Sequence, residues 1–470
     1  MLEIEDGDPL GWDNGSCDTA MNPTRKVTVP MKATTTRLPV EVTCDGEGLT
    51  SRAGTALLTG LSDRVGLTSG LVSGLRVHSR AVAHEPGRIV RDIAVMLADG
   101  GDCLTDLGAL RDQEVLFGPV ASDTTALRCI ERLDKTMLTR VCEARASSRA
   151  RVWGMSGAPG RVILDIDATL VTSHSDKERA AGNYKGGYGF HPLLCFEATT
   201  GEALAGILRP GNTGSNTATD HVEVLDRALA QLPAGSAGPG TLVRCDSAGA
   251  THMFLSAVVA RGLLFSVGCD LSGRVREAIL ALPESAWVSA LDAVGDLRDG
   301  AWVTELDIDL SGWPEGTRAI CRRERPHPGA QLTFSDEGGH RFQVMLTNQK
   351  GSRIARLEQL HRTRAAIEDS IRCSKASGLR NMPFHSFSKN EAWLELVLMG
   401  CDLVAWTRML LLHGTDMATA EPKTLRYRLF HVAGRVLTGS GQLKVRLQRG
   451  WEWGSAIIGA FARLRALPAS

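Results

Sequence analysis

The pattern of hydrophobic and polar positions divides the chain into a helical first third, a middle of strands and helices, and a helical last part. In the first 150 residues, apolar positions at helical spacing predict helices within 51–75, 87–101 and 104–134. A break at Val65–Gly66 separates two short helices in the first of these segments. The first third is therefore predicted to be mainly helical.

Two helices joined by a tight turn are found in many DNA-binding domains, but helical bundles contain the same arrangement. Residues 1–150 hold 17 Lys/Arg and 21 Asp/Glu, so DNA binding by this region would require a local basic face. The candidates for that face are Arg76, Arg80, Arg88 and Arg91. We expect a DNA-binding region at 1–150, and an ordinary helical bundle is the alternative.

The middle of the chain changes to strands that alternate with helices. RVILDIDATLV (161–171) is rich in branched apolar residues and predicts a strand, and HPLLCFEATTGEALAGILRP (191–210) predicts a hairpin that turns at Thr-Gly. An amphipathic helix at 217–232 and a strand–turn–helix–strand unit at 241–268 follow. This order predicts an α/β domain with a mixed sheet, and it is the order found in ribonuclease H-like folds.

Two further segments complete the expected organisation. Short alternating strands, among them AQLTFS (330–335), predict a β-rich insertion at 300–347 before a helix at 354–375. The apolar segment 390–412 predicts a buried core helix. The expected regions are 1–150 (helical, DNA-binding), 151–299 (first part of the α/β core), 300–347 (β-rich insertion), 348–380 (a helix that completes the core) and 381–470 (helical and basic).

The helix at 354–375 carries charge in an unusual place. At about 100° per residue, His361, Arg364, Glu368 and Lys375 fall within roughly 60° of one another and share one face. The expected apolar stripe lies beside that face and consists of Ile354, Leu357, Leu360, Ile367 and Ile371. A surface helix ordinarily keeps its charges opposite its apolar stripe, so an acid and bases at the edge of a core suggest a functional site.

Charge is distributed unevenly along the chain. The formal net charge is zero, but residues 1–150 carry −4, residues 151–350 carry −5 and residues 351–470 carry +9. A basic last part beside an acidic middle is expected when one region binds phosphates, although an arginine-rich helical domain would give the same numbers. The sequence has no apolar run of about 18 residues, no signal peptide and, among its 11 cysteines, no C-x-x-C pair. These features are typical of a cytosolic protein with reduced thiols and no membrane span.

Carboxylates mark the ends of the predicted core elements. Period two places Asp165 and Asp167 on one face of the strand at 161–171, and Asp246 ends a later strand. Glu368 lies on the charged helix. Taken singly, each acid could be a cap, a turn residue or a salt-bridge partner. Together they would converge on one edge of the sheet and suit Mg²⁺, a cation that prefers oxygen ligands.

The sequence resembles DDE transposases of bacterial insertion sequences, within the insertion sequence 4 superfamily. The superfamily's motif Tyr-x2-Arg-x3-Glu-x6-Lys is matched by Arg364, Glu368 and Lys375 and departs at His361. The stretches at 164–196 and 242–263 resemble, more narrowly, the insertion sequence 1380 family. The resemblance covers roughly residues 45–412. It implies Asp167 (by an Asp-x-Thr pattern, in preference to Asp165), Asp246 and Glu368 as catalytic metal ligands.

The resemblance also implies DNA contacts. Arg364 and Lys375 would hold phosphates of the transposon end, and His361 would contact a phosphate or base with a charge that varies near neutral pH. Lys185, in the glycine-rich NYKGGYGFH, would approach DNA, although a plain flexible connection fits this stretch equally well. Trp302 or Trp313 would hold an unstacked base, and a role in the core is the alternative for both.

We therefore expect a bacterial, cytoplasmic and nucleoid-associated DNA transposase. It would bind the inverted-repeat ends of its element as a homodimer and cut and join strands with Mg²⁺, for which Mn²⁺ would substitute. One alternative is a ribonuclease H-like nuclease that selects DNA structures without strand transfer. Another is a non-catalytic DNA-binding regulator, against which the complete set of three acids argues.

Overall fold

The computed structural model describes residues 42–76, 84–326, 329, 336–439 and 441–469. The chain divides into two compact units, Met1–Gly46 and Glu47–Ser470, and the features below belong to the second. Arg80 and the AQLTFS segment lie outside the described residues. None of the described helices is both long and apolar enough to cross a membrane.

The first part of the second unit is helical, as predicted. α1 (Ala56–Arg64) and α2 (Leu67–Gly74) are joined by a tight turn at Gly66, whose φ of 77° lies in the left-handed region that favours glycine. α3 (Pro86–Asp99) is buried on almost every side and packs against α2. The remaining elements are η1 (Leu104–Leu107), α4 (Gly108–Arg111), α5 (Glu114–Phe117), α6 (Asp123–Glu131) and the long α7 (Lys135–Ser156).

The expected basic face of this region is incomplete. Arg76 and Arg88 are exposed. Arg91 is buried and forms ion pairs with Asp92 at 2.7 Å and Asp63 at 3.3 Å, so it is not available to a surface ligand.

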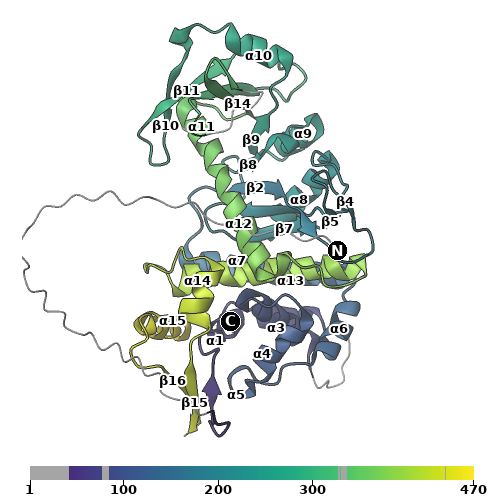
Figure 1. The fold of residues 1–470 in the computed structure, drawn as a ribbon, viewed down its shortest axis with the longest axis vertical. Coiled ribbons are helices and arrows are strands. Elements are labelled where there is room, and N and C mark those ends of the chain that lie inside the picture. The colour runs from purple at the N-terminus through teal and green to yellow at the C-terminus, as the bar shows by residue number, and fades with distance from the viewer. Residues whose placement is uncertain (1–41, 77–83, 327–328, 330–335, 440, 470) are drawn as a thin grey trace, which may run out of the picture. The chain divides into compact units, whose positions relative to one another are not determined.

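A ten-stranded mixed sheet forms the centre of the unit (Figure 1). Five strands come from the predicted α/β segment, in the order β7-β6-β2-β8-β9. β2 pairs antiparallel with β6 and parallel with β8, β6 pairs antiparallel with β7, and β8 pairs parallel with β9. Their bounds are β2 Ile163–Ala168, β6 Leu193–Glu197, β7 Ala203–Ile207, β8 Leu242–Cys245 and β9 Leu264–Cys269. The predicted strand, hairpin and strand–turn–helix–strand unit are thus present.

The β-rich insertion extends this sheet. β14 (His340–Thr347) pairs antiparallel with β9, and β12 (Arg318–Glu324), β11 (Leu297–Leu306) and β10 (Val288–Leu291) follow in that order. The short β13 (Asp336–Glu337) pairs with β14. A separate small sheet has the order β3-β5-β4, with bounds β3 Val171–Thr172, β4 Ala181–Gly182 and β5 Tyr188–Phe190.

Helices cover the sheet and connect it to the N-terminal helices. α8 (Ala218–Gln231) packs on β6 and β7, and the buried α13 (Phe387–Trp406) packs on β7, α7 and α3 (Figure 1). The other elements here are η2 (Ser247–Gly249), α9 (His252–Ala260), α10 (Gly273–Leu280) and η3 (Glu284–Ala286). Apolar side chains of the N-terminal helices, the sheet and α13 form one continuous core.

Buried ion pairs fix α7 and α13 to β7. Arg145 and Arg149 of α7 are fully buried and reach Asp402 of α13 at 2.9 and 2.7 Å. Arg149 also pairs with Glu202 at 2.9 Å, and the Glu202 carboxylate accepts from the indoles of Trp153 and Trp406 at 2.7 and 2.6 Å. Every partner in this network is therefore hydrogen-bonded, as buried charges require.

The last region is not only helical. After α13 come the π-helical turn Thr407–Leu411 (η6), α14 (Pro422–Leu425) and the π-helical turn Arg426–Phe430 (η7). An antiparallel hairpin of β15 (Gly434–Gly439) and β16 (Gln442–Leu447) then precedes α15 (Gly454–Ala466). β1 (Leu49–Thr50) pairs with β15 and completes a three-stranded sheet. The prediction of a purely helical region overlooked an alternation of apolar and polar residues in the sequence on each side of the residues Gly-Ser-Gly.

Candidate active site

Two of the predicted acids lie at the same edge of the central sheet. Asp167 is near the carboxyl end of β2, and Asp246 directly follows β8. Because β2 and β8 are parallel neighbours, their carboxyl ends meet at one edge. Asp246 caps η2 by accepting the N–H of Ala248 at 3.1 Å. This cap holds the Asp246 side chain at the end of the strand.

The surroundings of Asp167 combine burial, a cation and a second acid. Burial raises the pKa of Asp167 to about 6; Arg364 opposes this shift, and the nearby Asp246 carboxylate adds to it. Arg364 Nη1 lies 3.4 Å from Asp167 Oδ2. Two carboxylates held close together repel each other unless a cation or a proton lies between them.

Asp165 lies on the same strand face as Asp167 but has a different role. It is buried and forms a bidentate pair with Arg244 of β8, with N–O distances of 2.6 and 2.7 Å. Arg244 also donates to the hydroxyl of Thr363 at 2.7 Å and to the carbonyl of Leu360. Asp165 and Arg244 therefore fix the helix that carries Glu368 to the sheet, and the arrangement favours Asp167 as the acid that faces a ligand.

The predicted helix at 354–375 is interrupted. It consists of α11 (Ile354–Arg362), a 3₁₀ turn at Thr363–Ala365 (η4) and α12 (Ala366–Ser374), followed by a kinked turn at Lys375–Leu379 (η5), in which Ser377 and Gly378 are not helical. His361, Arg364 and Glu368 line one cleft of about 640 Å³, which Asp246 also lines. We call it the carboxylate cleft. Lys375 is not among its lining residues, so only three of the four predicted side chains share this surface.

The expected apolar stripe of this helix is also only partly correct. Ile367 and Ile371 are buried, but α11 buries Glu358 and Gln359, and its apolar residues are only half-buried. The reason is the partner of α11: it packs on β10 and β11, where Arg322 pairs with Glu358 at 2.6 Å and the Asp292 carbonyl accepts from Gln359. Polar residues can be buried there because they are paired.

The three predicted acids do not form one tight cluster. Among the described residues, one group of three potential ligands has all its ligand atoms within 4.8 Å of one another, and it consists of Asp102, Cys103 and Asp106. Asp167 and Asp246 are neighbours, and Glu368 lines the carboxylate cleft with Asp246. Carboxylates that together hold two metal ions about 3.5–4 Å apart need not all have their ligand atoms within 4.8 Å of one another.

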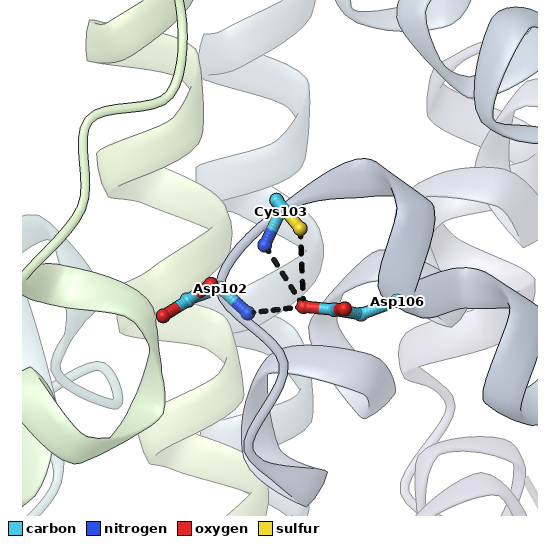
Figure 2. Close-up of side chains that lie close together, drawn as sticks. All are labelled: Asp102, Cys103 and Asp106. Carbon is cyan, nitrogen blue, oxygen red and sulfur yellow. Dashed lines mark hydrogen bonds between the residues drawn. The ribbon is translucent and has the colours of Figure 1, made fainter.

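The group around Asp102 is explained by local hydrogen bonds (Figure 2). Asp106 Oδ2 accepts the backbone N–H groups of Asp102 at 2.8 Å and Cys103 at 3.2 Å, and the Cys103 thiol at 3.3 Å. Asp102 pairs with Arg380 at 2.9 Å. This is a capping box at the start of η1, so the closeness of these groups does not require a metal.

The structure makes His361 a neutral group. Its Nδ1 lies 2.9 Å from the hydroxyl of Ser266. Burial, together with Arg364, Arg244 and Arg322, lowers the pKa of His361 to about 3. The expectation that its charge varies near neutral pH is therefore wrong. At the position where the motif of the resembled superfamily has tyrosine, His361 offers a hydrogen-bonding ring.

The carboxylate cleft is also lined by arginines that the sequence did not indicate as site residues. Arg322 and Arg362 both pair with Glu358, at 2.6 and 3.1 Å, and Arg341 also lines the cleft. Arg322 and Arg341 come from β12 and β14 of the insertion. The polar residues of RAICRRERP indicate a strand with a basic face. Its position at the cleft depends on the pairing of strands across the sheet, which the sequence does not show.

The charges of the two predicted lysines affect each other. Burial lowers the pKa of Lys375, and the positive charge of Lys185 lowers it further. Lys185 is exposed in a turn in which Asn183 Oδ1 accepts the N–H groups of Lys185 and Gly187 at 3.0 and 3.1 Å. The glycine-rich stretch therefore forms a defined turn.

The two candidate tryptophans occupy different places. Trp313 lines a second cleft of about 880 Å³, which also includes Asp246, and it stacks on His252 with ring centroids 4.1 Å apart. Trp302 lies under the guanidinium groups of Arg323 and Arg325, 4.9 and 5.4 Å from its ring centroid. Of the two, Trp313 is thus the one that shares a cleft with a predicted catalytic acid.

Comparison with known protein families shows which family the chain belongs to. The family described as "Transposase DDE domain group 1" matches residues 32–469. The chain belongs to this transposase family. The match supports the predicted DDE transposase, while membership of the insertion sequence 4 superfamily and the insertion sequence 1380 family stays a prediction. No curated protein matches this DDE transposase.

A similar solved structure is a cryo-EM structure of the piggyBac transposase synaptic complex with hairpin DNA. It is 11% identical, with a TM-score of 0.43, and the match covers 80% of this chain and 78% of that chain. A TM-score below 0.5 does not establish a common fold, so the family assignment rests on the sequence match alone.

Proposed function

We propose that this protein is a DNA transposase that binds the inverted-repeat ends of an insertion sequence and carries out metal-dependent strand cleavage and strand transfer. The observation that carries the proposal is the meeting of Asp167 and Asp246 at one sheet edge, with Arg364 beside them. The proposal includes a ribonuclease H-like core, which is supported by the strand order β7-β6-β2-β8-β9 and by the strand directions.

The carboxylates fit a divalent cation. Asp167 lies near a second carboxylate in a half-buried place, an arrangement that favours a bound cation over two bare charges. Asp167, Asp246 and Glu368 would hold Mg²⁺, and Mn²⁺ would substitute for it. When bound at such a cluster, the metal activates an attacking water or hydroxyl and stabilises the leaving oxygen of a phosphodiester.

The chain's own residues would position the DNA. Arg322 and Arg362 lie on the carboxylate cleft and would contact phosphates next to the acids, as guanidinium groups do well. Arg364 would orient Asp167 and contact a phosphate, and Lys375 with Lys185 would contact the backbone further along. His361 would hydrogen-bond without contributing charge.

The second cleft would receive a base. Trp313 would stack on an unpaired base beside Asp246, and its contact with His252 already orients the ring. Trp302 is the weaker candidate, because arginines cover its ring.

The remaining parts of the proposal concern organisation. We place DNA recognition in 1–150, the core in 151–299 and 348–380, the insertion in 300–347 and a basic region in 381–470. Two ends must be handled together, so a homodimer is the proposed working form, and the bacterial nucleoid in the cytoplasm is the proposed location.

Cleavage of a labelled duplex tests the function. The duplex carries the terminal repeats that flank the gene, and a scrambled duplex of the same length is the control. We expect Mg²⁺-dependent cutting and joining only with the repeats. Equal cutting of both duplexes would favour a structure-selective nuclease. Binding to the repeats without cutting would favour a non-catalytic regulator.

A further inference from the structure

The hairpin of β15 and β16, called the ribbon below, concentrates positive charge. Between Glu421 and Glu452 the sequence contains no Asp or Glu, but seven Lys and Arg residues. Arg426 is used inside the fold, where it donates to the carbonyls of Ala98 and Ala376. Five of the others are exposed, namely Lys423, Arg435, Lys444, Arg446 and Arg449.

Strand register places three of these cations on one face. Arg435 is paired across the strands with Arg446, and Leu437 with Lys444. Since side chains alternate between the two faces of a strand, Arg435, Lys444 and Arg446 lie on the same face. The opposite face carries Val445 and Leu447, which pack against the core. The basic face is therefore the outer one.

The cations of this face have no acidic partners among the described residues. Arg435, Lys444 and Arg446 form no ion pair or hydrogen bond through their side chains within the described part of the chain. Like charges opposite each other on paired strands are unfavourable. An external anion with several charges in a row would remove that cost.

Aromatic packing and strand pairing hold the ribbon in place. Trp451, Trp453 and Tyr427 form a cluster with ring centroids 5.4–5.7 Å apart at its base, and Trp451 donates to the carbonyl of Arg428 at 3.1 Å. β1 pairs along its other side. In Figure 1 the ribbon extends away from α1 and α15. Beyond its short pairing with β1 at Gly434 and Arg435 the ribbon has two strands, and the major groove of B-form DNA admits a two-stranded β-ribbon.

We propose that the basic face of the ribbon (Arg435, Lys444 and Arg446) binds the phosphate backbone of duplex DNA outside both clefts. The inference rests on the proposed function in that the DNA is the substrate of the transposase. The occupant is a duplex because its regular row of phosphates complements a row of unpaired cations, whereas a second copy of the ribbon would bring like charges together.

A salt titration of the full-length protein tests the proposal. The variant is Arg435→Gln, Lys444→Gln, Arg446→Gln, and the control variant is Arg151→Gln, Lys350→Gln, Arg353→Gln, which removes three exposed cations elsewhere. Binding of a fluorescent random-sequence duplex is measured in EDTA, so that catalysis does not contribute. Each lost phosphate contact lowers the slope of log affinity against log salt by about 0.9.

We expect the slope to fall by two to three in the ribbon variant, and to stay near the parental value in the control. Between about 50 and 200 mM salt, the parent would then lose about 40-fold more affinity than the ribbon variant. Equal slopes in parent and ribbon variant, or an equal fall in the control, would overturn the proposal. So would a changed oligomeric state by light scattering with an unchanged slope, because the face would then be a contact between copies.

Two measurements keep the test decisive. If the triple variant does not fold, Lys444→Gln and Arg446→Gln are measured singly, and each should lower the slope by about one. The parental cleavage assay separates the two proposals. A protein that cuts no duplex but shows the ribbon effect refutes the proposed function alone, and a protein that cuts repeats without the ribbon effect refutes the ribbon alone.

Discussion

Arginines are used in two different ways at the carboxylate cleft and on the ribbon. At the cleft, Arg364 lies beside Asp167, and Arg322 and Arg362 share Glu358. On the ribbon, Arg435 and Arg446 have no acidic partner among the described residues. Paired charges fix geometry and respond weakly to salt, while unpaired exposed charges act at a distance and are screened. The comparison suggests that the cleft orients DNA and the ribbon attracts it.

The largest expected effect concerns the three predicted catalytic acids. Asp167→Asn, Asp246→Asn and Glu368→Gln each remove a negative ligand but keep the shape of the side chain. Cleavage of the repeat duplex under Mg²⁺ should fall by about a thousand-fold or more, because the variants lose metal ligation. Binding should survive, and the triple variant should be little worse than the worst single one, as for residues that act as a unit.

The metal adds a control to this experiment. Mn²⁺ should restore cutting by the parent, and Ca²⁺ should allow binding without cutting. Near-parental cutting by Asp246→Asn or Glu368→Gln would refute the metal site. That result would leave the ribbon proposal intact.

The second effect concerns the buried pair of Asp165 and Arg244. Asp165→Asn leaves the Arg244 charge buried without its partner, so the free energy of unfolding should fall by about 3–5 kcal/mol. Urea-induced unfolding measures this loss. The double variant Asp165→Leu, Arg244→Met removes both charges and should recover most of the stability.

This experiment also separates the two acids of β2. If Asp165→Asn is as stable as the parent but inactive, while Asp167→Asn cuts normally, then Asp165 is the ligand and Asp167 is not. The geometry favours the opposite result, because Arg244 already occupies both oxygens of Asp165.

The sequence indicated most of the elements but not which of them would meet. β2, the β6–β7 hairpin, β8 and α13 follow from local periodicity, which a single segment displays. The choice between Asp165 and Asp167 depends on Arg244, which becomes a neighbour only through the pairing of β2 with β8. Pairing between distant segments has no local signal.

The charged helix shows the same limit. Its positions on one face were calculated for a regular helix, but the 3₁₀ turn at Thr363–Ala365 changes the phase, and the helix then ends in a kinked turn at Lys375–Leu379. In the latter turn Gly378 has a φ of 100°, and a side chain there would meet Leu97 at 2.4 Å. The kink after Lys375 is therefore packed closely against α3, which is far away in sequence.

The smallest expected effect concerns Arg364 and Lys375. Each should contact one phosphate, so Arg364→Ala and Lys375→Ala should each lower the salt slope of binding to pre-cleaved ends by about one. In affinity this is roughly a four-fold difference between about 50 and 200 mM salt, well below the effect expected for the ribbon.

The titration is run on the Asp246→Asn protein so that no strand is cut, and Arg353→Ala, which removes an exposed cation at the start of α11, is the control. Arg364 must share its guanidinium between Asp167 and a phosphate, whereas Lys375 forms no ion pair among the described residues. Lys375→Ala should therefore reduce affinity more than Arg364→Ala at low salt. An unchanged slope in both variants would show that neither side chain contacts the backbone, and the ribbon would then be the main source of the salt dependence.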